Sequence, residues 1–211
     1  MFIGVYNLAN FVTLLGLASS VLACFVASAG DYESLRWAVV LFLLSGLCDM
    51  CDGRIARGAG SRTRKEKVFG IQIDTVCDMV SFGVTPVVIA FFCGFNEWYH
   101  ILVYIIYTAC AAIRLAYFNT QAIEETPDLN MKAFTGVPVP FSCLVLPPLV
   151  LLLKFVDNPR NLAVALVYAF AYLAVGIAFI VNVKIMKLKI WECVLVVIFE
   201  LACISLLFIN L

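Results

Sequence analysis

Charged residues are scarce in this chain of 211 residues. Lys, Arg, Asp and Glu make up 13% of the sequence, whereas hydrophobic residues make up 64%, and the mean hydropathy is +1.04. A water-soluble domain has no means of burying that much apolar surface, so we expect a membrane protein. The formal net charge is zero, so the overall charge balance gives no argument for a strongly charged partner such as nucleic acid.

Other features are rare or missing as well. His100 is the single histidine; it lies beside Trp98 at an expected helix boundary, which favours an interfacial residue over a metal ligand. No basic segment precedes the first apolar stretch, so we expect no cleavable signal peptide. We find no internal repeat. The nine cysteines are scattered through apolar segments, and the lone Cys48-x-x-Cys51 pair is not expected to bind zinc.

Seven apolar stretches are long enough to cross a bilayer, which takes about 20 mostly apolar residues in a helix. They are separated by short polar breaks, so we expect one integral-membrane domain over residues 1–211. The predicted fold is an all-α, polytopic bundle of about seven transmembrane helices, with six to eight allowed by the ambiguous Pro147-Pro148 pair. The stretches cover residues 8–29, 35–57, 69–93, 97–118, 136–155, 161–182 and 190–210.

The distribution of basic residues predicts the orientation. We expect the protein in the inner or plasma membrane of the cell, with its active site facing the cytoplasm. If the amino terminus is cytoplasmic, most Lys and Arg residues lie on the cytoplasmic side, as the positive-inside rule requires. Only Arg36, Lys154 and Arg160 lie opposite. The cytoplasmic set is Arg54, Arg57, Arg62, Arg64, Lys65, Lys67, Arg114, Lys132, Lys184, Lys187 and Lys189.

Four aspartates lie inside otherwise apolar segments: Asp49, Asp52, Asp74 and Asp78. An ionised carboxylate there costs about 2.5 to 3.5 kcal/mol even on a lenient insertion scale, so a functional reason is expected. Each pair lies on one helical face, because the spacings are i, i+3 and i, i+4. Antiparallel packing of the two helices predicts Asp52 near Asp74 and Asp49 near Asp78, just inside the cytoplasmic interface.

Four crowded carboxylates repel one another unless cations are bound. Oxygen-rich sites suit hard divalent cations, so we expect Mg²⁺ or Mn²⁺, one or two ions, with Ca²⁺ as a further candidate. The alternative is structural pairing with Arg54 and Arg57, but two arginines do not neutralise four acids. Gly53, Ala56 and Gly70 leave space for a nucleotide beside the helices, or serve close packing alone.

Together these residues form the pattern Asp49-x-x-Asp52-Gly53-x-x-Ala56-Arg57, a spacer, and Gly70-x-x-x-Asp74-x-x-x-Asp78. The pattern resembles the signature of the CDP-alcohol phosphatidyltransferase family. The spacer is about four residues longer than is usual there, which one extra helical turn or a looser loop would absorb. The resemblance implies a core of six transmembrane helices, usually a homodimer, and a polar cavity open to the cytoplasmic leaflet.

The resemblance also implies residue roles. Asp49, Asp52 and Asp74 would be metal ligands, and Asp78 would complete the second metal site and act as general base. Substrate contacts to CDP-diacylglycerol would come from small and polar residues on three helices. These are Asn10, Thr13, Gly53, Ala56, Arg57 and Gly70; from spacing alone, Asn10 and Thr13 fit interhelical hydrogen bonding equally well.

Three strings resemble the bacterial and archaeal phosphatidylserine synthase branch, which implies serine as the acceptor alcohol and phosphatidylserine and CMP as products. Within them, Ser81, Arg114 and Asn119 are candidate acceptor-site residues. Arg114 would pair with the serine carboxylate or a donor phosphate, or else reach toward the membrane interface. The strings are residues 78–86 (DMVSFGVTP), 113–119 (IRLAYFN) and 134–140 (FTGVPVP).

Two alternatives remain open at this point. The acceptor of the same reaction could be glycerol 3-phosphate or an inositol phosphate, although a phosphorylated acceptor should need further cations, and Arg114 is the only arginine in the later helices. An ion-coupled transporter would also use intramembrane aspartates. It would be expected to carry acidic residues near the membrane midplane or internal symmetry, and we identify neither. A purely structural membrane protein would have no use for four clustered acids.

Overall fold

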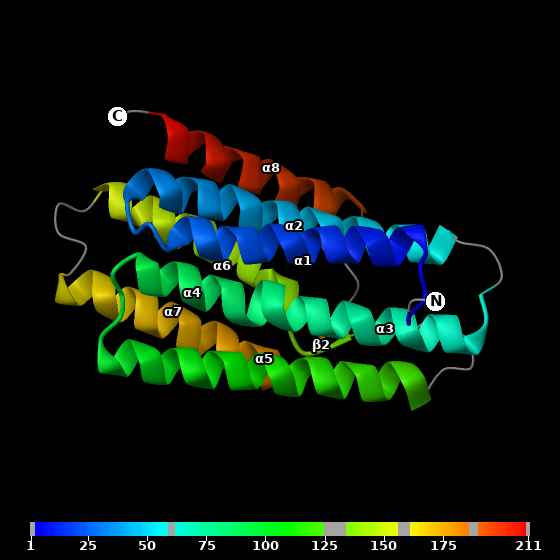
Figure 1. Cartoon of the computed structure of the whole chain (residues 1–211). Coiled ribbons are helices and arrows are strands. Elements are labelled where there is room, and N and C mark those ends of the chain that lie inside the picture. Colours follow the sequence, from blue (N-terminus) through cyan, green and yellow to red (C-terminus); the bar gives the residue numbers. More distant parts are fainter. Residues whose placement is uncertain (1–2, 59–61, 125–133, 156–160, 186–189, 210–211) are drawn as a thin grey trace.

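Long helices run nearly antiparallel along one axis and form a bundle (Figure 1). The computed structural model of the chain describes residues 3–58, 62–124, 134–155, 161–185 and 190–209. In these residues the chain makes seven helical rods, as the seven apolar stretches predict, and the all-α membrane fold is confirmed. The rods are α1 (Leu8–Ala27), α2 (Tyr32–Gly58), α3 (Arg64–Asp78) continued by the π-helix η1 (Met79–Val84) and α4 (Thr85–Phe92), α5 (Trp98–Glu124), the 3₁₀ helix η2 (Val139–Phe141) with α6 (Ser142–Leu152) and the 3₁₀ helix η3 (Leu153–Phe155), α7 (Leu162–Ile180) and α8 (Ile190–Phe208).

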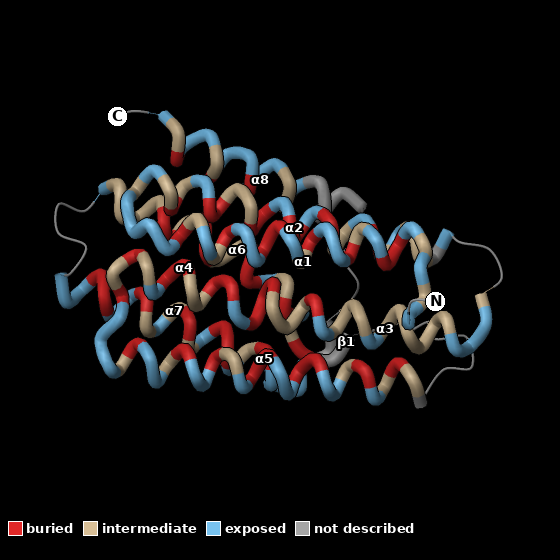
Figure 2. The backbone as a smooth tube through the Cα atoms, viewed as in Figure 1, coloured by how far each residue is buried: buried red, intermediate tan, exposed pale blue. Residues whose placement is uncertain are grey.

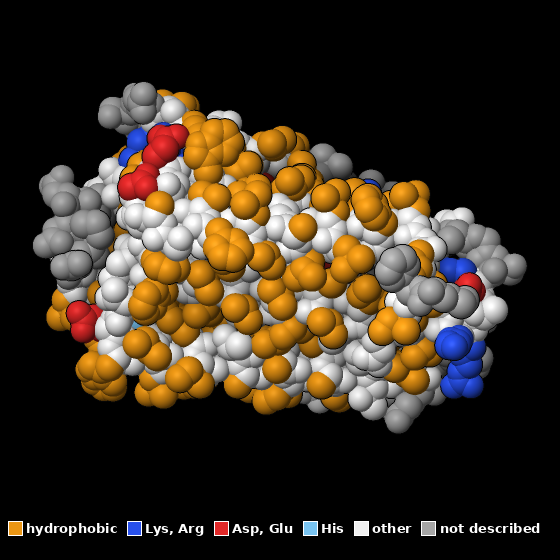
Figure 3. Space-filling model, in the orientation of Figure 1, with side chains coloured by type: hydrophobic (Ala, Val, Ile, Leu, Met, Phe, Trp, Pro, Cys, Tyr) orange, Lys and Arg blue, Asp and Glu red, His pale blue; other side chains and the backbone are white. Residues whose placement is uncertain are grey.

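Five of the rods are long and apolar enough to cross a membrane, counting only the described part of the chain. Two shorter apolar segments, Val139–Phe155 and Leu195–Phe208, accompany them. Buried residues face the inside of the bundle (Figure 2), and hydrophobic side chains cover the visible flank (Figure 3). Lys and Arg are prominent at the end of the bundle where α2 ends and α3 begins, with an acidic group beside them, and the other end shows acidic groups together with some Lys or Arg. This distribution is that of an integral membrane protein, with a lipid-facing flank between two polar ends.

Two helix boundaries differ from the sequence prediction. The third apolar stretch was expected to begin at residue 69, but α3 begins at Arg64 because a capping box precedes it: the Thr63 hydroxyl accepts from the Glu66 backbone N–H, and the Glu66 carboxylate accepts from the Thr63 backbone N–H. The long spacer is thus absorbed in part by extra helix. Likewise α5 continues to Glu124, six residues beyond the predicted end, since no Gly or Pro interrupts it.

A two-residue strand pair joins segments far apart in sequence. β1 (Phe134–Thr135) pairs antiparallel with β2 (Lys184–Ile185), so the segment before α6 is tied to the segment after α7. Gly136 follows β1 with φ +77°, and its N–H donates to the Val183 carbonyl at 2.8 Å. A Cβ at this position would lie 2.8 Å from the Phe179 carbonyl oxygen. Both the conformation and the lack of space therefore require glycine.

The carboxyl end of α8 is held by two cations from other rods. Arg36 on α2 donates to the Leu207 carbonyl at 3.4 Å, and Lys154 on η3 donates to the carbonyls of Leu206, at 2.9 Å, and Ile209. These carbonyls have no partner within their own helix, and the negative end of the helix dipole favours cations there. Arg36 and Lys154 are two of the three basic residues that the sequence places opposite the cytoplasmic side.

His100 is not the interfacial residue that the sequence suggests. Its side chain is only 1% exposed, and Nε2 lies 3.0 Å from the Ala165 carbonyl oxygen on α7. The prediction was wrong because α7 covers this face of α5. The imidazole is a packed residue between two helices.

Glu200 is an acidic residue in the middle of α8 that the sequence analysis overlooked when it found no such residue near the midplane. Its side chain is 9% exposed, and neither carboxylate oxygen has a hydrogen-bond partner within the described residues. A lone Glu in a helix of apolar residues is the signal that should have identified it.

We expect the substitution Glu200→Leu to stabilise the protein. Burying a polar group without a hydrogen bond costs about 1 to 3 kcal/mol, and leucine removes that cost while filling the space. Thermal unfolding of the detergent-solubilised protein should show a higher midpoint. The matched control is Glu97→Leu, at an exposed position before α5, where we expect a change within about 0.5 kcal/mol. A lower midpoint for Glu200→Leu would show that the carboxyl has a binding partner.

Candidate active site

Three of the four predicted aspartates come together. One carboxylate oxygen from each of Asp49, Asp74 and Asp78 lies within 4.8 Å of the others, and all three side chains are partly buried. Asp49 is on α2, whereas Asp74 and Asp78 are one turn apart on the same face of α3. The cluster therefore forms between two rods, as the spacing predicts for Asp49 and Asp78.

Asp52 lies near Asp74, as predicted, and also makes a contact to α1 that was not predicted. It is not one of the group of three, and its nearest described partner is on α1: the Thr13 hydroxyl lies 2.5 Å from Asp52 Oδ2. The same hydroxyl lies 3.1 Å from the Ala9 carbonyl oxygen, but a charged acceptor at shorter range takes the single proton. Asp52 is 5% exposed and remains close enough to interact electrostatically with Asp74 and Asp78. It thus links the cluster to α1.

The residues expected to contact the nucleotide lie beside the cluster. Asn10 is buried, donates to the Val5 carbonyl at 2.8 Å, and has its Oδ1 3.7 Å from where a Cβ at Gly70 would be. Gly70 lies one turn before Asp74, so this position without a side chain adjoins the acidic site. Gly53 and Ala56 are partly buried on α2. The side chain of Arg57 lies outside what the structure describes.

The three candidate acceptor residues are all buried, on η1 and α5. Ser81 is in η1, one turn after Asp78. Asn119 Oδ1 accepts from the Thr75 hydroxyl at 2.7 Å, which fixes α5 against the part of α3 that carries the aspartates. Thr75 was missed by the sequence analysis, although its place between Asp74 and Asp78 is a usable signal.

Arg114 lies beside the segment that follows β1. Its Nε donates to the Val137 carbonyl at 3.2 Å, and its guanidinium lies 5.5 Å from the centre of the Phe118 ring. No carboxylate in the described ranges lies within ion-pair distance of it. A buried guanidinium without a carboxylate partner is suited to binding an anion.

Comparison with known proteins identifies the family. The family model described as CDP-alcohol phosphatidyltransferase matches residues 6–181. The chain belongs to this family. The match is longer than the resemblance seen in the sequence, which spans about residues 7–142, and it takes in six of the seven rods, leaving α8 outside.

Curated relatives of this CDP-alcohol phosphatidyltransferase family member include proteins named CDP-diacylglycerol–serine O-phosphatidyltransferase. The protein from Saccharomyces cerevisiae is 30% identical over 141 residues, 64% of this chain and 50% of that protein. The one from Helicobacter pylori (strain 26695) is 31% identical over 155 residues, 72% of this chain and 59% of that protein. The one from Methanocaldococcus jannaschii is 30% identical over 142 residues, 67% of this chain and 59% of that protein. The chain therefore spans half to three fifths of the length of these relatives.

The cluster fits a divalent cation, as expected for a CDP-alcohol phosphatidyltransferase. Its donors are carboxylate oxygens, which hard cations prefer, and they come close enough to share an ion. Among the residues with described side chains, no basic group lies within ion-pair distance of Asp49, Asp74 or Asp78. Crowded carboxylates of this kind are stabilised by a bound cation. The identity and number of ions remain a proposal.

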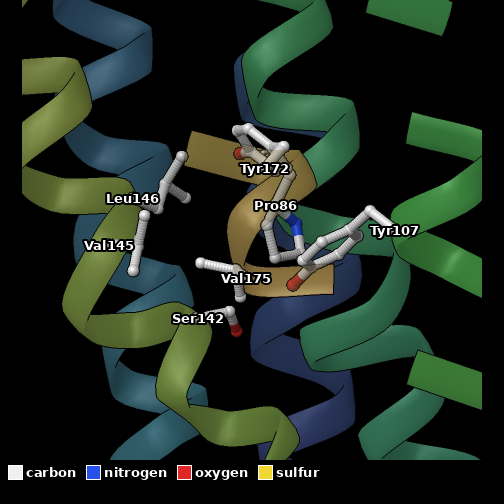
Figure 4. A pocket seen from close by; sticks show the side chains of 7 residues that line it. All are labelled: Pro86, Tyr107, Ser142, Val145, Leu146, Tyr172 and Val175. Carbon is white, nitrogen blue, oxygen red and sulfur yellow. Dashed lines mark hydrogen bonds between the residues drawn. The ribbon is translucent and has the colours of Figure 1, made fainter. Parts of the chain in front are cut away.

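A small cavity lies elsewhere in the bundle, among α4, α5, α6 and α7 (Figure 4). It has room for little more than a water molecule. It is lined by Pro86, Tyr107, Ser142, Val145, Leu146, Tyr172 and Val175, none of which is a predicted site residue. The polar cavity open to the cytoplasmic leaflet therefore stays a prediction.

Proposed function

We propose that this protein transfers a phosphatidyl group from CDP-diacylglycerol to L-serine, giving phosphatidylserine and CMP in phospholipid biosynthesis. The observation that carries the proposal is the group of Asp49, Asp74 and Asp78, whose carboxylates converge in the signature of a CDP-alcohol phosphatidyltransferase. The names of the curated relatives support serine as the acceptor. The similarity extends over half to three fifths of the length of those proteins, so the complete reaction is proposed for this chain.

The aspartates would hold one or two Mg²⁺ or Mn²⁺ ions. Asp49, Asp74 and Asp78 supply the converging ligands, and Asp52 is placed beside them by its hydrogen bond to Thr13. When bound, such ions neutralise phosphate charge and stabilise the attacking and leaving oxygens of a displacement at phosphorus.

The donor would bind along α1, α2 and the start of α3. Gly70 beside Asn10, together with the small residues Gly53 and Ala56, would let cytidine approach the backbones, because these positions carry little or no side chain. The hydrogen bond from the Thr13 hydroxyl would hold the Asp52 side chain next to the bound donor. Arg57 would balance charge on the CDP phosphates, and the acyl chains would stay in lipid.

Asp78 would act as general base. It takes the proton of the serine hydroxyl as the serine oxygen attacks the phosphorus that carries diacylglycerol, and the bond from that phosphorus to the CMP oxygen breaks. CMP leaves as an anion. Arg114, buried without a described carboxylate partner, would receive the serine carboxylate, while Ser81 and Asn119 would offer hydrogen bonds.

We also propose that the site faces the cytoplasm and that the protein is a homodimer. Lys and Arg gather at the end of the bundle where α2 ends and α3 begins, which supports this orientation through the positive-inside rule (Figure 3). The dimer is an expectation from the family resemblance.

The test is CMP release by the purified protein. We expect release from CDP-diacylglycerol that requires serine and either Mg²⁺ or Mn²⁺, and that stops when EDTA is added. Glycerol 3-phosphate, inositol phosphate and ethanolamine serve as alternative acceptors. Release with a phosphorylated acceptor but not with serine would replace the acceptor in the proposal. No release with any acceptor, together with ion-driven uptake in proteoliposomes, would favour the transporter reading.

A further inference from the structure

The helix that carries Asp74 and Asp78 changes geometry directly after Asp78. Residues Met79–Val84 form the π-helix η1, in which the Thr85 backbone N–H donates to the carbonyl of Val80, five residues earlier. A π-turn takes one residue more than an α-turn and is frequent at functional sites. It also leaves carbonyls without their usual α-helical donors, so these groups need partners from elsewhere.

Pro86 shows which carbonyl lacks a donor. Proline has no backbone N–H, so the carbonyl of Phe82, four residues earlier, has no α-helical donor. The Tyr107 hydroxyl on α5 supplies one, at 2.7 Å. Both side chains are fully buried, so water is not available as a substitute.

Neighbouring hydroxyls support the same segment. Thr108, the next residue on α5, donates to the Gly83 carbonyl at 3.2 Å, and the Thr85 hydroxyl donates to the Val80 carbonyl at 3.0 Å. Beyond the π-turn, the Tyr172 hydroxyl on α7 donates to the Pro86 carbonyl at 2.7 Å. Figure 4 shows Tyr107, Pro86 and Tyr172 around the small cavity. The start of α4 is therefore fixed to α7, and the π-turn is fixed to α5.

We propose that Tyr107 is a positioning residue for the acidic site, because its hydroxyl keeps η1 in the π conformation and thereby orients Asp74 and Asp78 toward Asp49. One residue corresponds to a rotation of about 100° in an α-helix. With α4 fixed by Tyr172, relaxation of the π-turn to α geometry would turn α3 by that amount and separate its aspartates from Asp49. The catalytic part of this inference rests on the proposed function, and the metal-binding part does not.

The test compares Tyr107→Phe with two further variants. Phenylalanine keeps the ring and removes the donor to Phe82, so we expect Mn²⁺ affinity, measured by electron paramagnetic resonance without substrate, to fall about 10- to 100-fold, the range seen when groups that orient metal ligands are lost. The turnover number should fall with it. The double variant Tyr107→Phe/Pro86→Ala restores a backbone donor for the Phe82 carbonyl. We expect it to regain thermal stability in EDTA but not Mn²⁺ affinity, since the segment then relaxes to α geometry.

The matched control is Tyr104→Phe. It lies one turn earlier on α5 and also donates from a buried hydroxyl to a carbonyl, that of Phe95 at 3.0 Å, but beyond the far end of α4. It should lose stability and keep Mn²⁺ affinity.

Equal Mn²⁺ affinity in Tyr107→Phe and Tyr104→Phe, or recovery of affinity in the double variant, would overturn the inference. If Tyr107→Phe does not fold, Thr108→Val removes the donor to Gly83 instead and should weaken Mn²⁺ binding in the same direction; unchanged binding would again overturn it. Wild-type protein that binds Mn²⁺ but releases no CMP would refute the proposed function alone.

Discussion

The substitution Asp78→Asn is expected to reduce serine-dependent CMP release by about 10²- to 10⁴-fold, the contribution typical of a general base. Asparagine keeps the shape and one neutral oxygen but removes a negative charge from the group formed with Asp49 and Asp74, so Mn²⁺ affinity should fall as for Asp49→Asn, and turnover is compared at saturating Mn²⁺. It also loses the ability to accept the proton of the serine hydroxyl. Binding of CDP-diacylglycerol, measured by equilibrium titration with Mn²⁺ present, should change much less than the turnover number.

Asp31→Asn is the matched control for this change. Asp31 precedes α2, is exposed, and accepts hydrogen bonds from the Ser34 backbone N–H at 2.9 Å and hydroxyl at 2.7 Å. Its substitution should affect helix capping slightly and leave turnover unchanged. Turnover of Asp78→Asn within a few-fold of wild type would show that another group takes the proton.

Asp49→Asn is expected to combine a large loss of activity with a gain in stability of the metal-free protein. Loss of a metal-bound transition state costs several kcal/mol, on the order of 10³-fold in rate. In EDTA, however, the substitution removes one of three carboxylates whose oxygens lie within 4.8 Å of one another, so their repulsion falls and the unfolding midpoint should rise. Adding Mn²⁺ should then raise the midpoint much less than in wild type, because bound ligand stabilises in proportion to its affinity.

Thermal unfolding in detergent, with EDTA or Mn²⁺, separates these effects, and Asp31→Asn again provides the reference. An Asp49→Asn protein that keeps the wild-type response to Mn²⁺ would contradict a shared metal site. A lower midpoint in EDTA would indicate that Asp49 has a stabilising partner rather than repelling neighbours.

The sequence predicts the bundle well because each rod is a long apolar run bounded by polar residues, a signal that depends on local composition alone. It also predicts that Asp49 meets Asp78, since both spacings place the side chains on one helical face. The start of α3 is also predictable, because Thr63 and Glu66 have capping-box spacing. It was missed because the residues around them are polar and do not belong to an apolar stretch.

The remaining features depend on partners far away in the chain. Asp52 turns toward Thr13, 39 residues earlier, and no pattern on α2 specifies that choice. The π-helix after Asp78 is stabilised by Tyr107, and the burial of His100 depends on α7. Pro86 is the one local indication, because proline provides no backbone N–H for the Phe82 carbonyl. It does not indicate which hydroxyl supplies the hydrogen bond instead. These contacts depend on how the helices pack against one another, and the hydrophobic periodicity of a single helix does not specify that packing.

The docking of α8 has a consequence for the basic residues at this end of the bundle. Lys154 would be a costly charge at the edge of a bilayer, and peptide carbonyls at the end of α8 accept its hydrogen bonds, whereas Arg36 also forms an ion pair with Glu33 on its own helix. Both cations lie within the family match, at residues 6–181, whereas α8 lies beyond it. Loss of α8 would thus remove the described hydrogen-bond acceptors of Lys154, whereas Arg36 would keep its ion pair with Glu33.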